Sequence, residues 1–218
     1  MGELLAAHPD VRYVFEAHSV WECAGPGINQ SSRLTAQDAK PGVISQIREF
    51  FSSEGASSKL VVEKNPRNAL RVPYIRAVFP EAKIIHIVRD GRDVACSMRP
   101  GCGGEEWRHL KPPDWQELFS RYSGALRCAL AWRSVLEIAL ADLRDVPHIQ
   151  VRYEDLVADP VSVSRLLLEY VGLPIVPEVA DFCKHIQDST ADSYHAANQS
   201  RWYRADHARR IGRWQENL

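Results

Sequence analysis

Short apolar runs alternate with longer amphipathic stretches along this chain. Four runs rich in valine and isoleucine have the length and composition of buried parallel strands: Val11–Phe15, Leu60–Glu63, Lys83–Val88 and His148–Tyr153. Strands that alternate with helical segments are typical of βαβ units, in which neighbouring strands run parallel. The pattern predicts an α/β fold, a parallel β-sheet flanked by helices, in a single domain over residues 1–218.

Two helical segments are predicted from the spacing of apolar residues. Asn68–Phe79 lies between the second and third strands, and Pro73 inside it should kink or break the helix. In Asp114–Leu143, apolar residues recur at steps of three and four, which predicts one long helix with a single apolar face.

A further helix is predicted after the fourth strand. Asp159 has the character of an N-cap, Pro160 suits the first helical position, and Gly172 suits the end of the helix. Three apolar residues of this helix are expected to face the core: Leu166, Leu167 and Val171.

Two segments have no regular periodicity. Gly25–Gly42 and Pro100–Pro113 are rich in glycine, proline and polar residues. Each can be a loop over a binding site or an ordinary surface loop, and the sequence leaves both interpretations open.

Composition narrows the class of protein. The 27 basic and 28 acidic residues give a net charge of −1, which argues against nucleic-acid or membrane-surface binding but allows a local basic pocket. No apolar run approaches the ~20 residues of a membrane span. The five cysteines include no CxxC pair and no metal-ligand spacing, which favours a reduced, cytoplasmic protein with no metal cofactor.

The third predicted strand is followed by a candidate anion-binding segment. Arg89 stands at the strand end, where its guanidinium can hold a phosphate with two hydrogen bonds. Gly91 permits a tight turn into a helix whose N-terminus attracts anions, and Ser97 can add a hydroxyl donor. The alternative is that the charged residues of this segment form only surface ion pairs: Arg89, Asp90, Arg92 and Asp93.

Two further strand ends carry candidate ligands of the same site. Lys64 follows the second strand and would add a compact cation, unless it is a lysine that only extends into solvent. Tyr153 ends the fourth strand and can contact an aromatic base or cover the core. Because ligands of parallel sheets bind at the carboxyl ends of the strands, these residues are expected to lie at one edge.

The joint order of these motifs resembles that of sulfotransferases that use 3′-phosphoadenosine-5′-phosphosulfate (PAPS). The motifs are EKNPR from residue 63, RDGRDVACS from residue 89 and YEDL from residue 153. The resemblance implies a P-loop-NTPase-like sulfotransferase fold in which Arg89 and Ser97 hold the 3′-phosphate of the nucleotide. It implies that Lys64 stabilises the oxygen between the leaving phosphate and the sulfuryl group, and that Tyr153 lies near the adenosine.

The resemblance also implies a base for the acceptor's proton. Glu16 stands at the matching place after the first strand, and His18, two residues on, is the weaker candidate. If the strand continues this far, its period of two would point both side chains to one side. In the C-terminal segment, Arg209 or Arg210 would reach the 3′-phosphate, with a solvated basic tail as the alternative.

One expected element of the family is missing from the sequence. Members begin with a strand and a loop of the PxSGTT type, which binds the phosphosulfate through backbone N–H groups. The residues MGELLAAHPDV at the start of this chain resemble the end of the helix that follows that loop. We therefore expect an N-terminally truncated fold that lacks the central strand. Either the start of the gene is misplaced at an internal methionine, or the protein is truly truncated.

The sequence supports two functions of different classes. The first is a PAPS-dependent sulfotransferase acting on a hydroxyl or amine of a small molecule, glycan or peptide. The second is a non-catalytic homologue that binds adenosine 3′,5′-bisphosphate or a protein partner. A P-loop kinase is disfavoured because the sequence contains neither a GxxxxGK[ST] loop nor a magnesium-binding carboxylate at a strand end.

Overall fold

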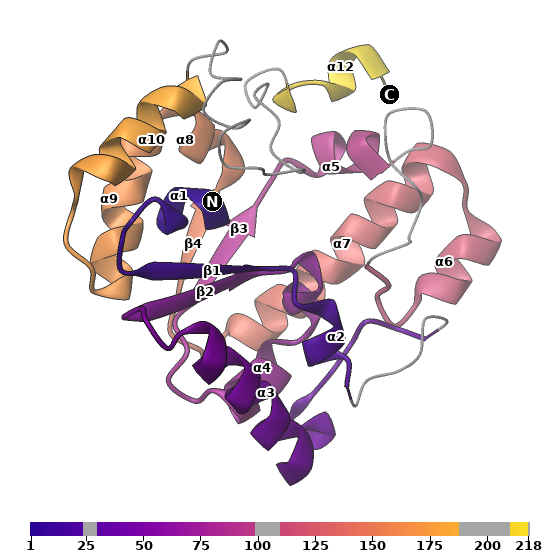
Figure 1. Cartoon of the computed structure of the whole chain (residues 1–218). Coiled ribbons are helices and arrows are strands. Elements are labelled where there is room, and N and C mark those ends of the chain that lie inside the picture. The colour runs from indigo at the N-terminus through magenta and orange to yellow at the C-terminus, as the bar shows by residue number, and fades with distance from the viewer. Residues whose placement is uncertain (24–29, 99–109, 188–209, 218) are drawn as a thin grey trace.

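The computed structural model describes residues 1–23, 30–98, 110–187 and 210–217 (Figure 1). Its four strands form two parallel pairs. In the first pair β1 (Val11–Phe15) runs beside β2 (Leu60–Lys64), and in the second β3 (Ile84–Val88) runs beside β4 (His148–Arg152). The predicted α/β class and all four strands are confirmed, with strand ends within one residue of those expected.

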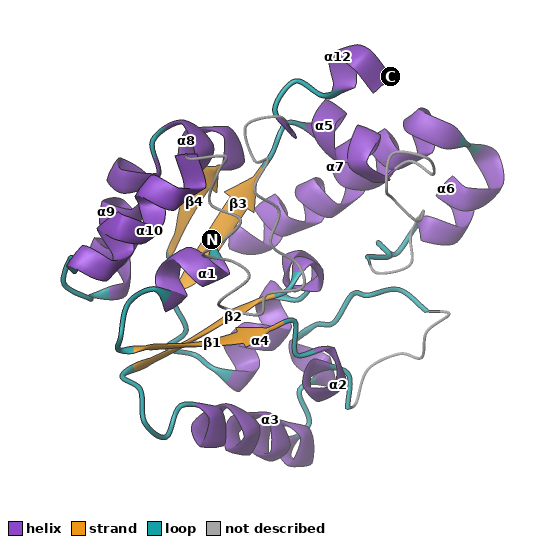
Figure 2. Ribbon diagram, turned by 45° about the horizontal axis from the view of Figure 1, so that its top comes forward, coloured by secondary structure: helices purple, strands orange, loops and turns teal. Residues whose placement is uncertain are grey.

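Two groups of helices cover the strands (Figures 1 and 2). The first apolar core joins α1 (Gly2–Ala6), α9 (Pro160–Val171) and α10 (Pro177–Gln187) to both strand pairs. The second core lies among three other helices and again includes residues of both pairs: α2 (His18–Trp21), α3 (Pro41–Glu54) and α4 (Val72–Val78). The two strand pairs therefore share their cores although no ladder joins them among the described residues.

The strands β2 and β3 are less buried than their sequences predict. Every residue of both strands is only partly buried, whereas β1 buries Val11 and Val14 and β4 buries Val151. Apolar residues of β2 and β3 contribute to both cores. Each of the two strands is hydrogen bonded on one side only in the described part of the chain.

The expectation of one long helix over Asp114–Leu143 is wrong. The segment forms α6 (Trp115–Arg121) and α7 (Gly124–Leu143). Ser123 is extended and Gly124 has a φ of +56°, a conformation that glycine adopts without strain, so the helix is interrupted there. The break also divides the predicted apolar face, and Phe119 and Leu126 are half exposed.

The other helix predictions hold with local changes. Pro73 lies in the first turn of α4, after a separate 3-10 turn η2 (Pro66–Leu70), so the predicted break falls before it. Asp159 caps α9 by accepting a hydrogen bond from the backbone N–H of Ser162, and Gly172 ends α9 with a φ of +82°. The expected inward position of Leu166 is wrong: it is exposed, and Leu168 is buried with Leu167 instead.

The remaining elements are short helices and a 3-10 turn. A 3-10 turn η1 (Ala36–Asp38) precedes α3, and α5 (Gly91–Met98) follows β3. The helix α8 (Tyr153–Ala158) follows β4 directly, so Tyr153 is helical rather than the last strand residue. A short α12 (Trp214–Asn217) lies near the C-terminus (Figure 1). None of the described helices is long and apolar enough to cross a membrane.

Candidate active site

The first cluster of predicted site residues lies where β1 and β2 end. Glu16 follows β1 with a φ of +41°, and its backbone N–H donates to the carbonyl of Lys64 at 3.2 Å. The Lys64 Nζ lies 2.5 Å from Glu16 Oε1 and 4.8 Å from the centroid of the Phe15 ring. The carboxylate and the ammonium are both partly exposed, so solvent or a substrate can reach the pair.

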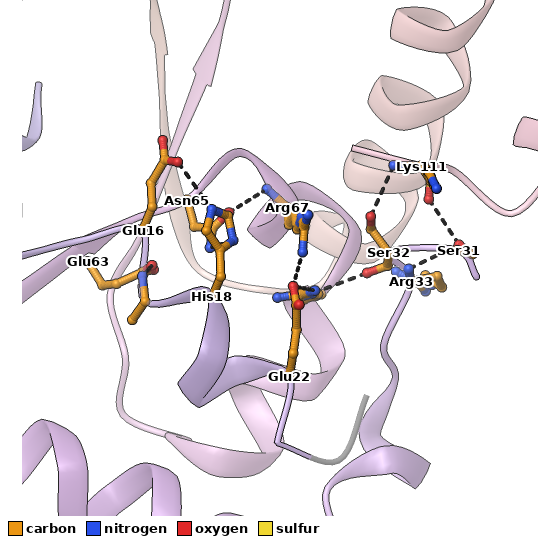
Figure 3. A network of polar contacts seen from close by, with 12 residues as sticks. Glu16, His18, Glu22, Ser31, Ser32, Arg33, Glu63, Asn65, Arg67 and Lys111 are labelled. Atoms are coloured by element: carbon orange, nitrogen blue, oxygen red, sulfur yellow. Dashed lines mark hydrogen bonds and ion pairs between the residues drawn. The ribbon is translucent and has the colours of Figure 1, made fainter. Parts of the chain in front are cut away.

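His18 completes this cluster and acts on the same carboxylate (Figure 3). Its Nε2 lies 3.2 Å from Glu16 Oε2, and its Nδ1 lies 3.1 Å from Asn65 Nδ2. The Asn65 amide is oriented by its Oδ1, which accepts the backbone N–H of Arg67, so Nδ2 is a donor toward the imidazole. In a neutral imidazole the hydrogen then resides on Nε2 and is donated to Glu16.

The expectation that a strand period of two brings Glu16 and His18 to one side is wrong, although the two side chains do meet. The strand β1 ends at Phe15, and His18 is the first residue of α2, so a strand period of two does not apply. The left-handed backbone at Glu16 turns the chain, and the backbone N–H of His18 donates to the Glu16 carbonyl at 2.6 Å. A tight turn therefore brings the two side chains together.

Glu63 supports this turn and was not identified from the sequence. Its Oε1 accepts the backbone N–H of Ala17 at 3.2 Å, and its Oε2 accepts Asn68 Nδ2 at 2.6 Å. Burial raises the pKa of Glu63 although both hydrogen bonds favour the carboxylate. The sequence gives no signal for this role, because a glutamate at the end of an apolar strand can equally well face solvent.

Beside this cluster, a further carboxylate binds two arginines, one within η2 and one at the C-cap of η2. Glu22 forms ion pairs with Arg67 and with Arg71, whose Nη2 lies 3.0 Å from Glu22 Oε1. The Arg71 side chain is 2% exposed. Burial acts to raise the pKa of Glu22, but the hydrogen bonds from Arg71 and Arg67 outweigh it and hold that pKa below its usual value.

The same network reaches the two segments predicted as irregular loops (Figure 3). Arg71 Nε donates to the carbonyl of Ser32 at 3.1 Å. The backbone N–H of Ser32 donates to the Lys111 carbonyl at 2.7 Å, and the Lys111 N–H donates to Ser32 Oγ at 3.0 Å. These residues belong to Gly25–Gly42 and Pro100–Pro113, whose remaining parts include residues outside the described ones.

The second cluster of predicted site residues lies where β3 and β4 end. Arg89 follows β3; its Nη2 donates to the Arg210 carbonyl at 2.6 Å, and its Cζ lies 5.0 Å from the centroid of the Tyr153 ring. The Arg89 Nε is buried and has no hydrogen-bond partner in the part of the chain that the structure describes. The fold thus brings three of the predicted nucleotide ligands together, while Arg209 lies outside the described residues.

The sequence allowed two interpretations of the segment after β3, an anion-binding site or surface ion pairs, and its remaining residues do not all follow one of them. Asp90 and Arg92 form an ion pair with the arginine largely exposed, as the surface-pair alternative predicted. Asp93 is instead buried, with 1% of its surface exposed. The Ser97 hydroxyl donates to the Asp93 carbonyl at 2.8 Å, within α5. No cluster of three or more metal-ligating side chains occurs among the described residues.

Fold and clusters together define an α/β protein that gathers lysine, arginine and carboxylate side chains at the carboxyl ends of parallel strands. The chain belongs to the sulfotransferase family, whose model matches residues 1–178. A solved sulfotransferase domain from the curacin biosynthetic pathway has a TM-score of 0.55 and 17% identity, over 100% of this chain and 92% of that one. This likeness shows that the fold is shared.

Curated relatives are named for several kinds of acceptor. Protein-tyrosine sulfotransferase A of Caenorhabditis elegans is 22% identical, over 80% of this chain and 46% of its own length. A putative protein-tyrosine sulfotransferase of that species is 30% identical, over 80% and 66%. Carbohydrate sulfotransferase 2 of Homo sapiens is 27% identical, over 57% and 29%. The chain spans about half the length of the first of these, and less than two thirds of the others.

Proposed function

We propose that this protein transfers the sulfuryl group of PAPS to a hydroxyl or amine of a small molecule, glycan or peptide. The observation that carries the proposal is the contact between Glu16 and Lys64 at the ends of two parallel strands. In transfer from a phosphosulfate, a carboxylate can take the proton of the acceptor and a lysine can stabilise the leaving oxygen. Family membership supports sulfuryl transfer as the reaction class.

In this proposal each residue of the first cluster has a separate role. Glu16 accepts the proton of the attacking hydroxyl or amine. His18 donates a hydrogen bond to the second oxygen of Glu16 and orients that carboxylate. When bound, PAPS supplies the activated sulfuryl group and leaves as adenosine 3′,5′-bisphosphate. Lys64 turns from Glu16 toward the oxygen on which negative charge develops, which is an electrostatic role that needs no metal.

The second cluster is proposed to hold the nucleotide. Arg89 fits a phosphate ligand because its buried Nε has no hydrogen-bond partner among the described residues, while Nη2 is fixed on the Arg210 carbonyl. A guanidinium with one free edge can give a phosphate oxygen a charge-assisted hydrogen bond. Tyr153 is proposed to lie near the adenosine, and the proposed 3′-phosphate ligands are completed by Ser97 and by Arg209 or Arg210.

The proposal includes several classes of acceptor, because the relatives are named for different ones. Their names include protein tyrosine and carbohydrate. The two irregular segments, which meet through Ser32 and Lys111, are the proposed walls of the acceptor pocket. A cytoplasmic location is proposed because the four described cysteines are all free thiols, as expected in a reducing compartment.

The direct test is transfer of label from radiolabelled PAPS to a panel of phenols, sugars and tyrosine peptides. We expect labelled product from at least one acceptor, and loss of that product in Lys64→Ala. Labelled product that forms equally well in Lys64→Ala would contradict the proposal, because leaving-group stabilisation is then supplied elsewhere.

A second candidate function is binding of adenosine 3′,5′-bisphosphate or a protein partner without transfer. It is favoured by the sides of β2 and β3 that carry no ladder among the described residues. In this reading the cluster of Arg89, Tyr153 and Arg210 still binds the bisphosphate, but no sulfuryl group is transferred. Nucleotide binding without labelled product in the transfer assay would support it.

A further inference from the structure

A buried carboxylate attaches the C-terminal segment to α5. Asp93, in the first turn of α5, accepts the backbone N–H of Gly212 at 2.9 Å and that of Trp214 at 3.1 Å, one on each oxygen. Gly212 has a φ of +75°, a conformation that favours glycine, and this lets both N–H groups face the same carboxylate. Because Asp93 is 1% exposed, these donors replace the water that its charge would otherwise require.

The same short segment also contacts the candidate nucleotide site. Two residues before Gly212, the carbonyl of Arg210 accepts Arg89 Nη2 at 2.6 Å. On the other side, the Arg92 guanidinium lies 4.1 Å from the centroid of the Trp214 ring. The segment from Arg210 to Trp214 therefore spans from the end of β3 to the start of α5, and Asp93 is its buried anchor.

We propose that Asp93 is a positioning residue of the nucleotide site, acting through Arg89. By holding Gly212 and Trp214, Asp93 places the Arg210 carbonyl where it fixes the Arg89 guanidinium beside the Tyr153 ring. An arginine fixed in advance loses less side-chain freedom when it binds a phosphate, so binding is tighter. This inference rests on the proposed function in one respect, namely that Arg89 binds the 3′-phosphate.

The test is Asp93→Asn in the full chain. A carboxamide has the same shape but one acceptor oxygen and one N–H₂ donor, so it cannot hold both N–H groups, and the segment that carries both amides loosens. We expect faster hydrogen exchange of the Gly212 and Trp214 amides. We expect the Kd for adenosine 3′,5′-bisphosphate to rise about tenfold, while the Kd for adenosine 5′-monophosphate changes by less than about twofold.

Two further variants keep the test decisive. Asp10→Asn makes the same charge change at a carboxylate that pairs with the exposed Lys59 rather than with the C-terminal segment, and should leave both measurements near wild type. Trp214→Ala loosens the segment from its own side and should reproduce the selective loss of bisphosphate affinity, even if Asp93→Asn does not fold.

The outcomes separate this inference from the proposed function. If the wild-type chain binds no bisphosphate, the proposed function fails, and the exchange of the Gly212 and Trp214 amides still tests the anchor. If Asp93→Asn frees both amides but leaves bisphosphate affinity unchanged, Asp93 is not a positioning residue and the nucleotide site stands without it. Equal losses for both nucleotides would also overturn the inference, because they indicate general unfolding.

Discussion

Lys64 and Glu16 form an ion pair of 2.5 Å across the ends of two neighbouring parallel strands. The register pairs Phe15 with Lys64, so Glu16 is the first residue beyond the ladder, and it adopts a φ of +41° there. A non-glycine residue in this conformation costs on the order of 1–3 kcal/mol and persists where the surroundings enforce it. Here the backbone bond from Glu16 to the Lys64 carbonyl and the contact with His18 enforce it.

The pair leads to a prediction that separates proton removal from leaving-group stabilisation. Glu16→Gln should lower turnover on the order of 10²–10⁴-fold for an acceptor hydroxyl of high pKa, and much less for a nitrophenol, which loses its proton near neutral pH. Lys64→Ala should lower turnover for every acceptor. Steady-state rates over acceptors of graded pKa measure the difference.

His18→Ala serves as the control for the base assignment. It removes a hydrogen bond to Glu16 but leaves the carboxylate, so its effect should be small beside that of Glu16→Gln. A loss in His18→Ala that grows with acceptor pKa would make the histidine the base. An equal loss from Glu16→Gln for all acceptors would mean that Glu16 positions the substrate or the backbone turn.

The nucleotide site predicts a graded loss of affinity. Arg89→Ala should weaken binding of adenosine 3′,5′-bisphosphate more than tenfold, because a charge-assisted hydrogen bond contributes about 1.5–3 kcal/mol. Ser97→Ala should cost on the order of 1 kcal/mol at most, because a neutral hydroxyl contributes less, and in this structure it donates to the Asp93 carbonyl. Isothermal titration calorimetry measures both. Unchanged affinity in Arg89→Ala would remove Arg89 from the site.

Among the described residues, β2 and β3 each carry a ladder on one side only, and this predicts the effect of adding a strand. An upstream extension with an apolar strand and a PxSGTT-type loop should raise the Tm by about 10 °C or more, since each kcal/mol shifts a chain of this size by about 2–4 °C. It should also raise the rate of PAPS-dependent transfer. A scrambled extension of equal length is the control. An equal rise of the Tm with the scrambled extension would contradict the prediction.

The Glu22 cluster predicts a large loss of stability from a single neutral substitution. Glu22→Gln removes the negative charge that faces Arg71, whose side chain is 2% exposed. This substitution should destabilise the fold by about 2–4 kcal/mol. Glu54→Gln breaks a surface pair with Arg12 and should cost less than about 1 kcal/mol. Urea unfolding measures both free energies. Equal costs would mean that the buried pair contributes no more than the surface pair.

The α-amino group of Met1 predicts how stability depends on pH. In the 218-residue chain burial lowers its pKa from 8.0 to about 6; the charge of Glu3 opposes this shift and that of Lys64 adds to it. Between these values the unfolded chain binds the proton and the folded chain does not, so stability should rise from pH 6 to pH 8, by at most about 3 kcal/mol. The chain acetylated at Met1 is the control, and an equal rise in both forms would assign the effect to other groups.

The sequence determined the strands, the fold class and the residues at the strand ends. Valine- and isoleucine-rich runs favour the extended conformation wherever they are buried, so all four strands lie within a residue of their predicted ends. The motifs around Lys64 and Arg89 contain side chains whose charge and hydrogen-bond donors do not depend on exact geometry. A guanidinium at a strand end has the same charge and donors in any context.

Only the tertiary structure decided which of these side chains meet. His18 reaches Glu16 through a left-handed turn and Asn65, and Asp93 reaches Gly212 over 119 residues of sequence. The break at Gly124 likewise follows from one backbone angle that a helical pattern does not record. Periodicity reports which residues can be buried, whereas long-range hydrogen bonds depend on how separate elements are packed. For that reason the sequence indicated an aspartate in a charged segment, and only the fold showed it to be a buried anchor.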